Sequence, residues 1–249
     1  MLLSIITVTY NASQWLERTI QSVVRQSYPR IEYIIVDGNS TDGTVEIIKK
    51  YRKAITQFIS EPDKGLYDAM NKGLKLASGD YVLFINAGDT LYSDGTVQDI
   101  ADLINKENVP DIVYGETLIV DIDGNPLGMR RLKAPEKLTW KSFSMGMLVC
   151  HQSFLVKRAI ADCFDLQYRF TADFDWCIRC LRKAKTILNT RLILSQFLEA
   201  GYSAANRKES LKERYLIMCK YYGKIPTQIR HVWFFIRFYT AKWTKKTVS

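Results

Sequence analysis

Residues 86–89 place a carboxylate directly after a run of apolar residues. The sequence Asn86-Ala87-Gly88-Asp89 follows Tyr81–Ile85, which has the composition of a buried strand. A carboxylate at the end of a buried strand can bind a hard divalent cation, and the cation can neutralise a diphosphate group. An aspartate in this place can also form a turn or cap a helix, so residues 86–89 by themselves leave both interpretations open.

Three further polar segments lie where apolar runs end. Tyr10-Asn11 closes the first run, Asp37 follows the second, and Asp63-Lys64-Gly65 predicts a type I turn whose lysine could reach a phosphate. Each of these acids also has an ordinary interpretation as a turn residue. The chain contains neither standard spacing of a glycine-rich phosphate loop, which disfavours P-loop kinases and dinucleotide dehydrogenases.

A pair of acids lies in the second half of the chain. Asp173 and Asp175 belong to the segment Thr171-Ala172-Asp173-Phe174-Asp175-Trp176, at the predicted start of a helix. An oriented carboxylate there could remove the proton from an attacking hydroxyl group. Acids are also favoured at helix N-termini for electrostatic reasons, so helix capping is the alternative interpretation.

The apolar runs that carry these polar residues alternate with helical patterns. The expected strands span residues 2–10, 31–36, 57–60 and 81–85, and the expected helices span about 15–24, 44–51, 66–76 and 96–105. This alternation predicts a parallel sheet with right-handed crossovers. Because ligands bind at the carboxyl ends of such strands, Tyr10-Asn11, Asp37 and residues 86–89 should gather at one edge of the sheet.

The pattern changes after about residue 110. Ile112–Val120 and Leu127–Leu132 flank Asp123-Gly124-Asn125, which is typical of a β-hairpin. The remaining expected elements are a helix at 135–143, a strand at 152–156, a helix at 174–183, a strand at 186–194 and basic helices from Asn206 onward. The chain therefore divides into residues 1–125, 126–205 and 206–249.

The charges are unevenly distributed along the chain. The net charge is +9 over 249 residues, but residues 1–125 hold 11 Lys and Arg against 18 Asp and Glu, whereas residues 126–249 hold 24 against 8. A strongly basic segment usually faces an anionic partner, such as nucleic acid, a phosphorylated substrate or a membrane surface. The basic half therefore leaves open a nucleic-acid-binding module as a function of a different class.

The C-terminal segment is both basic and aromatic. Residues 201–249 hold 11 Lys and Arg against two acids, and Ile229–Trp243 has the pattern of a helix. This helix either packs on the core or lies in the interface of an anionic membrane. No stretch reaches the roughly 18 apolar residues of a membrane span, and the N-terminus lacks the pattern of a signal peptide.

The cysteines indicate a reducing compartment, with the cytoplasm as the default. The five are odd in number and absent from the first 149 residues, which is a poor disulfide framework. Cys177 and Cys180 have the spacing of a redox or zinc pair, but no second pair accompanies them. Their apolar neighbours predict a structural role in a buried helix.

Six segments of the first 90 residues carry polar motifs in a fixed order. They are Thr7–Asn11, Asp37–Thr44, Glu61–Gly65, Asp68–Gly73, Ala77–Asp80 and Asn86–Asp89. In this order they resemble the family-two glycosyltransferases, and most closely the bacterial sugar transferases of exopolysaccharide and lipopolysaccharide assembly. Residues 145–180 resemble the same family more loosely. The resemblance implies the α/β GT-A fold, a Rossmann-like, mostly parallel sheet with flanking helices, extended here by basic C-terminal helices.

The resemblance also implies a role for residues that bind the donor. The residues expected to contact the nucleotide base and ribose are Thr9, Tyr10, Asn11 and Asp37. The residues expected to close or line the rest of the donor pocket are Asp63, Lys64, Asp68, Asn71, Asn86 and Ala87. Asp89 would be the last acid of the DXD motif and would hold Mn²⁺ or Mg²⁺, although Asn86 stands where many relatives have the first aspartate.

On the acceptor side, the resemblance makes Asp173 the catalytic base and places His151 and Gln152 against the acceptor. Residues 1–125 would then form the nucleotide-sugar-binding half, residues 126–205 the acceptor-binding half, and residues 206–249 the C-terminal helices.

The expected function is that of an inverting glycosyltransferase. It would move a sugar from a nucleotide-diphosphate donor to a hydroxyl of a lipid-linked glycan in cell-surface polysaccharide assembly, as a peripheral protein at the cytoplasmic, inner face of the cell membrane. An anionic membrane surface is then an expected partner, and nucleic acid is not. A sugar-phosphate nucleotidyltransferase is a second alternative, which the acids at 173–175 and the missing glycine-rich loop disfavour.

Overall fold

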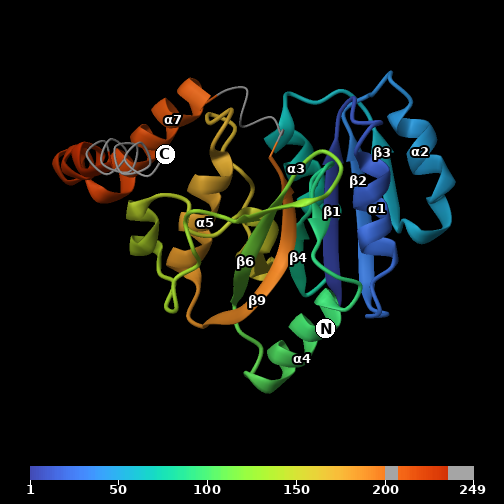
Figure 1. Cartoon of the computed structure of the whole chain (residues 1–249), viewed down its shortest axis with the longest axis horizontal. Helices are drawn as coiled ribbons and strands as arrows, with labels where there is room; N and C mark the ends of the chain where they lie inside the picture. Colours follow the sequence, from blue (N-terminus) through green and yellow to red (C-terminus); the bar gives the residue numbers. More distant parts are fainter. Residues whose placement is uncertain (200–206, 235–249) are drawn as a thin grey trace, which may run out of the picture.

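The chain folds around a mixed β-sheet (Figure 1). A computed structural model describes residues 1–199 and 207–234. Its strands are β1 (Leu3–Thr9), β2 (Ile31–Asp37), β3 (Gln57–Ser60), β4 (Tyr81–Phe84), β5 (Thr90–Leu91), β6 (Ile112–Val120), β7 (Pro126–Met129), β8 (Phe154–Lys157) and β9 (Ile187–Leu198). Within the described residues the nine strands follow the order β3-β2-β1-β4-β8-β6-β9-β5, and β7 pairs with β6.

Helices cover both faces of this sheet. They are α1 (Leu16–Val24), α2 (Thr44–Lys50), α3 (Leu66–Leu76), α4 (Thr96–Lys106), α5 (Ala172–Lys183) and α7 (Arg207–Tyr222), with 3₁₀ turns η1 (Arg52–Ala54), η2 (Trp140–Met145), η3 (His151–Ser153) and η4 (Arg158–Ile160). Residues of α1, α2 and α4 form a core with one face of the sheet, and residues of α3, α5 and α7 form a second core with the other. Figure 1 shows α1 and α2 at one end of the molecule and α5 and α7 at the other.

The predicted parallel arrangement of the first four strands is confirmed. β1 pairs in parallel with β2 and with β4, and β2 pairs in parallel with β3. All seven residues of β1 are buried, because helices cover both sides of it. The register places Thr9 opposite Asp37, and the Ala87 amide donates to the Val8 carbonyl (3.2 Å), so three polar segments do meet at one edge of the sheet.

The second half of the sheet is mixed rather than parallel. β8 lies antiparallel between β4 and β6, while β9 runs parallel to β6. β9 extends to Leu198, beyond the expected end of the strand, and its last residues pair with the short strand β5 at Thr90–Leu91. That pairing brings residues 197–198 beside the segment that ends at Asp89.

The expected helix at 135–143 is wrong. Only a 3₁₀ turn, η2, forms at Trp140–Met145. The Tyr114 hydroxyl donates to the carbonyl oxygens of Pro135 (2.7 Å) and Glu136 (3.0 Å), which would be the first acceptors of the expected helix. A tyrosine on β6 therefore binds the carbonyls that an α-helix would use, and the pattern within 135–143 does not include this distant residue.

The described part of the C-terminal region packs on the rest of the chain. Ile217 and Met218 of α7 belong to the core over α5, and Phe234 packs against the same core. Residues 224–234 are also helical, whereas residues 200–206 and the remainder of the expected helix at Ile229–Trp243 lie outside the described residues. In the part of the chain that is described, no helix is long and apolar enough to cross a membrane.

The structural role of Cys177 and Cys180 is supported by their place in α5, where both side chains are buried. Burial raises the pKa of the Cys180 thiol to about 12 and raises that of Cys177 as well, so both are neutral thiols rather than reactive thiolates.

A buried carboxylate connects the amino-terminal ends of neighbouring parallel strands, at the edge of the sheet opposite the polar residues. Glu32 on β2 accepts hydrogen bonds from the Ser4 hydroxyl (2.5 Å), from the Ser78 amide (2.8 Å) and from the Ser78 hydroxyl (2.7 Å). Its side chain links β1, β2 and the loop that leads into β4. Burial acts to raise the pKa of Glu32, but these hydrogen bonds outweigh burial and lower it.

We predict that Glu32 makes folding stability dependent on acid pH. Because the pKa of Glu32 is lower in the folded chain, its contribution is present above its ordinary pKa of 4.5 and is lost as the pH falls through the folded value. Glu32→Gln should lower the free energy of unfolding at pH 7 by about 1–3 kcal/mol. Urea unfolding at pH 7 and pH 4 measures this, and an equal pH dependence in the variant and the wild type would contradict it.

Candidate active site

A cavity of about 880 Å³ opens at the carboxyl edge of the parallel strands. Its walls come from segments far apart in the sequence, and its lining includes Thr9, Tyr10, Asp63, Asn86, Ala87, Asp89, His151, Gln152 and Asp173. The cavity therefore brings together nine of the residues that the sequence predicted for the site. Its volume falls in the range of small-molecule sites.

Two loops at this edge are fastened to each other by side chains. The Asn11 amide donates to the Ser40 hydroxyl (2.8 Å), and the Thr41 amide donates to Asn11 Oδ1 (3.0 Å). Asp37 is fully buried and accepts from the amide and hydroxyl of Ser40 and from the Ser60 hydroxyl. Asn11 and Asp37 thus order the wall of the cavity, and neither side chain lines it.

The cavity has an aromatic side chain at its mouth and an unpartnered hydroxyl beneath. Tyr10 is 65% exposed and lines the cavity, as a stacking surface for a planar ring would. Thr9 Oγ1 is buried and has no hydrogen-bond partner in the described part of the chain. A Cβ on Gly38 would lie 2.5 Å from Asp63 Oδ2 and 3.2 Å from the Tyr10 ring, so only glycine allows these side chains to approach.

The turn before α3 and α3 itself contribute one of their four predicted residues to the cavity. Asp63 lines it and accepts from the Gly65 amide (2.7 Å). Lys64 is exposed, with its amide bound by Asp68 (3.0 Å), and neither side chain lines the cavity. Asn71 is also held elsewhere, because its side chain accepts from the Phe164 amide (2.6 Å) and donates to the Phe164 carbonyl (3.0 Å).

Asp89 is a carboxylate at the bottom of the cavity, with 5% of its surface exposed. Its Oδ2 accepts from Gln152 Nε2 (2.7 Å) and its Oδ1 accepts from the Leu198 amide (3.1 Å). Burial raises the pKa of Asp89 to about 6, although the bonds from Gln152 and the Leu198 amide and the charge of Arg18 oppose the rise. Gln152, predicted to contact the acceptor, is here a partner of Asp89.

A chain of hydrogen bonds joins the strand-end turn to the second acid. Asn86 Nδ2 lies 3.2 Å from His151 Nε2, and His151 Nδ1 lies 3.1 Å from Asp173 Oδ2. An ionised Asp173 can only accept, so His151 carries its proton on Nδ1 and accepts from Asn86 at Nε2. The Tyr67 hydroxyl donates to the other oxygen of Asp173 (3.0 Å).

This chain of bonds keeps Asp173 ionised. Burial acts to raise its pKa, but the hydrogen bonds from His151 and Tyr67 and the charge of Arg214 outweigh burial and lower the pKa. About 20% of the side chain remains exposed. Asp173 is therefore an oriented carboxylate with access to the cavity, which is what a general base requires.

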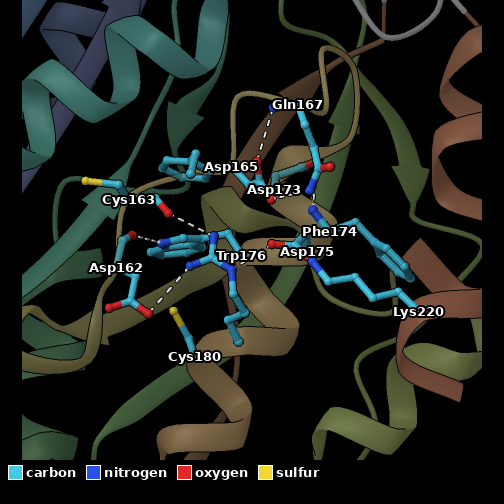
Figure 2. Close-up of polar contacts among 12 residues, drawn as sticks. Asp162, Cys163, Asp165, Gln167, Asp173, Phe174, Asp175, Trp176, Cys180 and Lys220 are labelled. Atoms are coloured by element: carbon cyan, nitrogen blue, oxygen red, sulfur yellow. Dashed lines mark hydrogen bonds and ion pairs between the residues drawn. The ribbon is translucent and has the colours of Figure 1, made fainter. Parts of the chain in front are cut away.

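Asp175 lies on the same helix but has a different environment. Its side chain is fully buried and accepts from Arg179 Nε (2.6 Å), from Lys220 Nζ (3.0 Å) and from the Tyr221 hydroxyl (2.8 Å). Figure 2 shows Asp175 with Lys220 close to it. Asp175 thus ties α5 to α7 and has no contact with the cavity.

The start of α5 is held by a carboxylate from α7. Glu213 accepts hydrogen bonds from the backbone amides of Arg169 (2.9 Å), Phe170 (2.8 Å) and Thr171 (3.0 Å). A carboxylate at this place satisfies amides that the helix leaves unpaired and complements the helix dipole. The N-terminal turn that carries Asp173 is therefore fixed by the C-terminal region.

The residues at the bottom of the cavity suit a divalent cation shared with a ligand. Asp89 offers carboxylate oxygens, and Asn86 Oδ1 is buried with no partner among the described residues. Within residues 1–199 and 207–234, no three His, Cys, Asp or Glu residues gather as a complete ligand set. Mg²⁺ and similar ions are held by one or two protein oxygens together with substrate phosphates, so this sparse set fits that mode of binding.

Several residues of the site were not predicted from the sequence. Tyr67 and Arg169 line the cavity, and Trp15 does so with a buried indole Nε1 that has no partner in the described chain. Tyr67 directly precedes the predicted Asp68, so a polar aromatic in the first helical turn was a usable signal. Nothing in the local sequence marks Trp15 or Glu213.

Comparison with known proteins gives a consistent result. The model of the family described as glycosyl transferase family 2 matches residues 4–164. A PGL/p-HBAD biosynthesis glycosyltransferase of Mycobacterium tuberculosis is 32% identical over 205 residues, which cover 80% of this chain and 77% of the relative. The putative teichuronic acid biosynthesis glycosyltransferase TuaG of Bacillus subtilis is 29% identical over 211 residues, or 83% and 82% of the two chains.

Solved structures share the fold at lower sequence identity. S. aureus TarS 1–349 in complex with UDP superposes with a TM-score of 0.69 at 21% identity over 88% of this chain, and the match spans 64% of the TarS chain. The mannosyltransferase PcManGT from Pyrobaculum calidifontis, in complex with GDP-Man and Mn²⁺, gives a TM-score of 0.60 at 16% identity over 86% of this chain and 63% of its own.

The family match covers well over half of the chain, and the mycobacterial relative aligns along most of both proteins. The chain thus belongs to glycosyl transferase family 2, a family of sugar-transferring enzymes, and its sheet and flanking helices form the GT-A fold.

Proposed function

We propose that the chain transfers a sugar, with inversion, from a nucleotide-diphosphate donor to a hydroxyl of a lipid-linked glycan. Its family makes it a glycosyltransferase, and its relatives act in the biosynthesis of cell-surface glycans. The observation that carries the proposal is the pairing of two acids in one cavity: Asp89 at the bottom, and Asp173 held ionised by His151 and Tyr67.

A nucleotide sugar fits the donor side of the cavity. TarS has been solved with UDP and with UDP-GlcNAc, and PcManGT with GDP-Man. In this chain the exposed ring of Tyr10 offers a stacking surface, and Thr9 Oγ1 is left for a ligand to bond. Asp89 and Asn86 would hold Mn²⁺ or Mg²⁺, which when bound supplies positive charge to the diphosphate.

The reaction needs one proton acceptor on the opposite side of the sugar. The acceptor hydroxyl oxygen attacks the anomeric carbon as the bond from that carbon to the diphosphate oxygen breaks, and Asp173 takes the hydroxyl proton. The bonds from His151 Nδ1 and the Tyr67 hydroxyl leave Asp173 ionised and fix its orientation before substrate arrives. His151 thereby acts on the base rather than on the acceptor.

Family membership and the acid-lined cavity favour sugar transfer over the two alternatives. A nucleic-acid-binding module does not need paired acids in a cavity, and a nucleotidyltransferase does not need a base in the position of Asp173.

We also propose that the C-terminal region rests on the anionic inner face of the cell membrane. Ile225, Ile229 and Val232 are 71%, 65% and 60% exposed, and their spacing places them on one side of the helix at residues 224–234. Lys224, the first residue of this helix, is exposed beside them. An exposed apolar stripe with a cation at its end fits an interfacial helix on an anionic surface.

Replacing Asp89 tests the donor site. Asp89→Asn should remove the effect of Mn²⁺ on UDP binding, because a neutral amide does not offset the charge of the cation. Calorimetric titration of UDP with and without Mn²⁺ measures this, with Asp99→Asn on the exposed face of α4 as the matched control. Equal UDP affinity with and without Mn²⁺ in the wild type would contradict the metal assignment.

Replacing the two acids of α5 tests the base. Asp173→Asn keeps the shape of the side chain but removes its basicity, so kcat should fall at least about 10²-fold with little change in donor affinity. Asp175→Asn should instead lower the free energy of unfolding by about 1–3 kcal/mol and leave kcat nearly unchanged, because it loses bonds to Arg179 and Lys220. The reverse pattern of kcat losses would show that the base is misassigned.

Charges placed in the exposed apolar stripe test membrane binding. Ile225→Glu combined with Ile229→Glu should weaken binding to phosphatidylglycerol vesicles about 10-fold or more, since each isoleucine would lose its apolar contact. Ile122→Glu is the control, because Ile122 is 52% exposed and lies far in the sequence from the helix at residues 224–234. Flotation assays read the result, and unchanged binding of the double variant would refute this part of the proposal.

A further inference from the structure

A buried threonine of α1 holds the backbone of the turn that carries Asp89. Thr19 is fully buried, and its hydroxyl donates to the Asp89 carbonyl (2.8 Å) and accepts from the Gly88 amide (2.9 Å). A threonine inside a helix ordinarily bonds a carbonyl of the preceding turn or faces water. Thr19 instead bonds two residues that lie 69 and 70 positions further along the chain, so its hydroxyl joins α1 to the bottom of the cavity.

The turn needs these bonds because no strand fixes its backbone. Residues 86–89 lie between β4 and β5 and belong to neither strand, and Gly88 has a φ of 102°. The Asp89 amide donates to the Asn86 carbonyl (2.9 Å), which closes the turn. Buried amide and carbonyl groups need partners, and the Thr19 hydroxyl supplies one partner to each kind. Without this hydroxyl the turn would have to move to pair its backbone again.

The carboxylate of the same residue is held from the other side. Gln152 and the Leu198 amide each donate to one oxygen of Asp89, and each oxygen can accept a further interaction. These bonds orient the carboxylate relative to η3 and β9, whereas Thr19 fixes the backbone of Asp89 relative to α1. A small divalent cation requires ligand oxygens at about 2.1 Å in a nearly fixed geometry. The carboxylate can therefore meet a cation correctly only if its backbone is also in place.

We propose that Thr19 is a positioning residue of the cation site, whose hydroxyl places Asp89 for the Mn²⁺ or Mg²⁺ ion that the donor diphosphate shares. This inference rests on the proposed function and adds to it a fully buried residue of α1. Residues that hold a metal ligand in place typically change metal affinity 10–100-fold when they are replaced, although they do not touch the ion. Thr19 should therefore act on the part of donor binding that depends on the cation.

Two substitutions separate the hydroxyl of Thr19 from the bulk of its side chain. Thr19→Val keeps the shape but removes the hydrogen bonds, and Thr19→Ser keeps the hydroxyl. UDP or GDP, whichever the wild type binds more tightly, is titrated into the full chain with and without Mn²⁺ under calorimetric detection. We expect Thr19→Val to reduce the gain in nucleotide affinity from Mn²⁺ about 10-fold and to leave the affinity without Mn²⁺ nearly unchanged. Thr19→Ser should retain most of the gain.

Ser22→Ala is the matched control. Ser22 lies on the same face of α1, and its hydroxyl accepts from the Leu91 amide (3.2 Å), two residues beyond Asp89. This control should lower the melting temperature and leave the gain from Mn²⁺ unchanged, as would Thr19→Val if Thr19 had only a structural role. Thr19→Cys, whose thiol is a weak donor and a weak acceptor, takes the place of Thr19→Val if the valine variant does not fold.

The outcomes separate this inference from the function on which it rests. A gain from Mn²⁺ that Thr19→Val retains in full overturns the role of Thr19 and leaves the donor proposal standing. An equal loss of the gain in Ser22→Ala also overturns that role, because a general loosening of α1 would then explain both variants. If Mn²⁺ does not change nucleotide affinity in the wild type, the assignment of Asp89 to the cation fails, and the inference about Thr19 fails with it.

Discussion

An ionised carboxylate that is mostly removed from water must be surrounded by donors, and Asp173 is in that position. Its two oxygens are bonded by His151 from η3 and by Tyr67 from α3, while Glu213 from α7 holds the first turn of its own helix. Removing any one of these elements would either neutralise the carboxylate or turn it. The packing of α3 and α5 on one face of the sheet, with α7 over α5, is therefore also what keeps this carboxylate charged and directed at the cavity.

This arrangement explains why an asparagine suits position 86. Asn86 donates to His151 Nε2, so the imidazole keeps its proton on Nδ1 and donates it in a hydrogen bond to Asp173. A carboxylate at position 86 would accept from the same ring and compete with Asp173 for its protons. The turn that follows β4 thus contributes to both ends of the cavity: Asp89 lies at its bottom, and Asn86 acts through His151 on Asp173.

The cations in the basic second half of the chain have different roles. Lys220 and Arg179 neutralise Asp175 and hold α7 to α5, which is a structural role. Arg214 lies over the Phe174 ring, and its charge instead lowers the pKa of Asp173, which is a role in the site. An excess of positive charge counted over a segment cannot distinguish these uses, because the distinction depends on which acid each cation meets in the folded chain.

The sequence by itself determined the alternating first half of the fold and the cavity residues that lie at strand ends. Apolar runs and turn residues are local signals, and parallel strands necessarily bring their carboxyl ends to one edge, so Thr9, Tyr10 and Asp89 could be placed without coordinates. Only the tertiary structure decided that His151 and Gln152 bond the two acids, that Lys64 and Asn71 lie outside the cavity, and that residues 135–139 are not helical. Each of these depends on a side chain from a distant segment, such as Tyr114 taking the carbonyls of Pro135 and Glu136. Asp173 and Asp175 share one helical turn and similar sequence signals, yet they point about 160° apart around the helix, so one meets the cavity and the other meets α7.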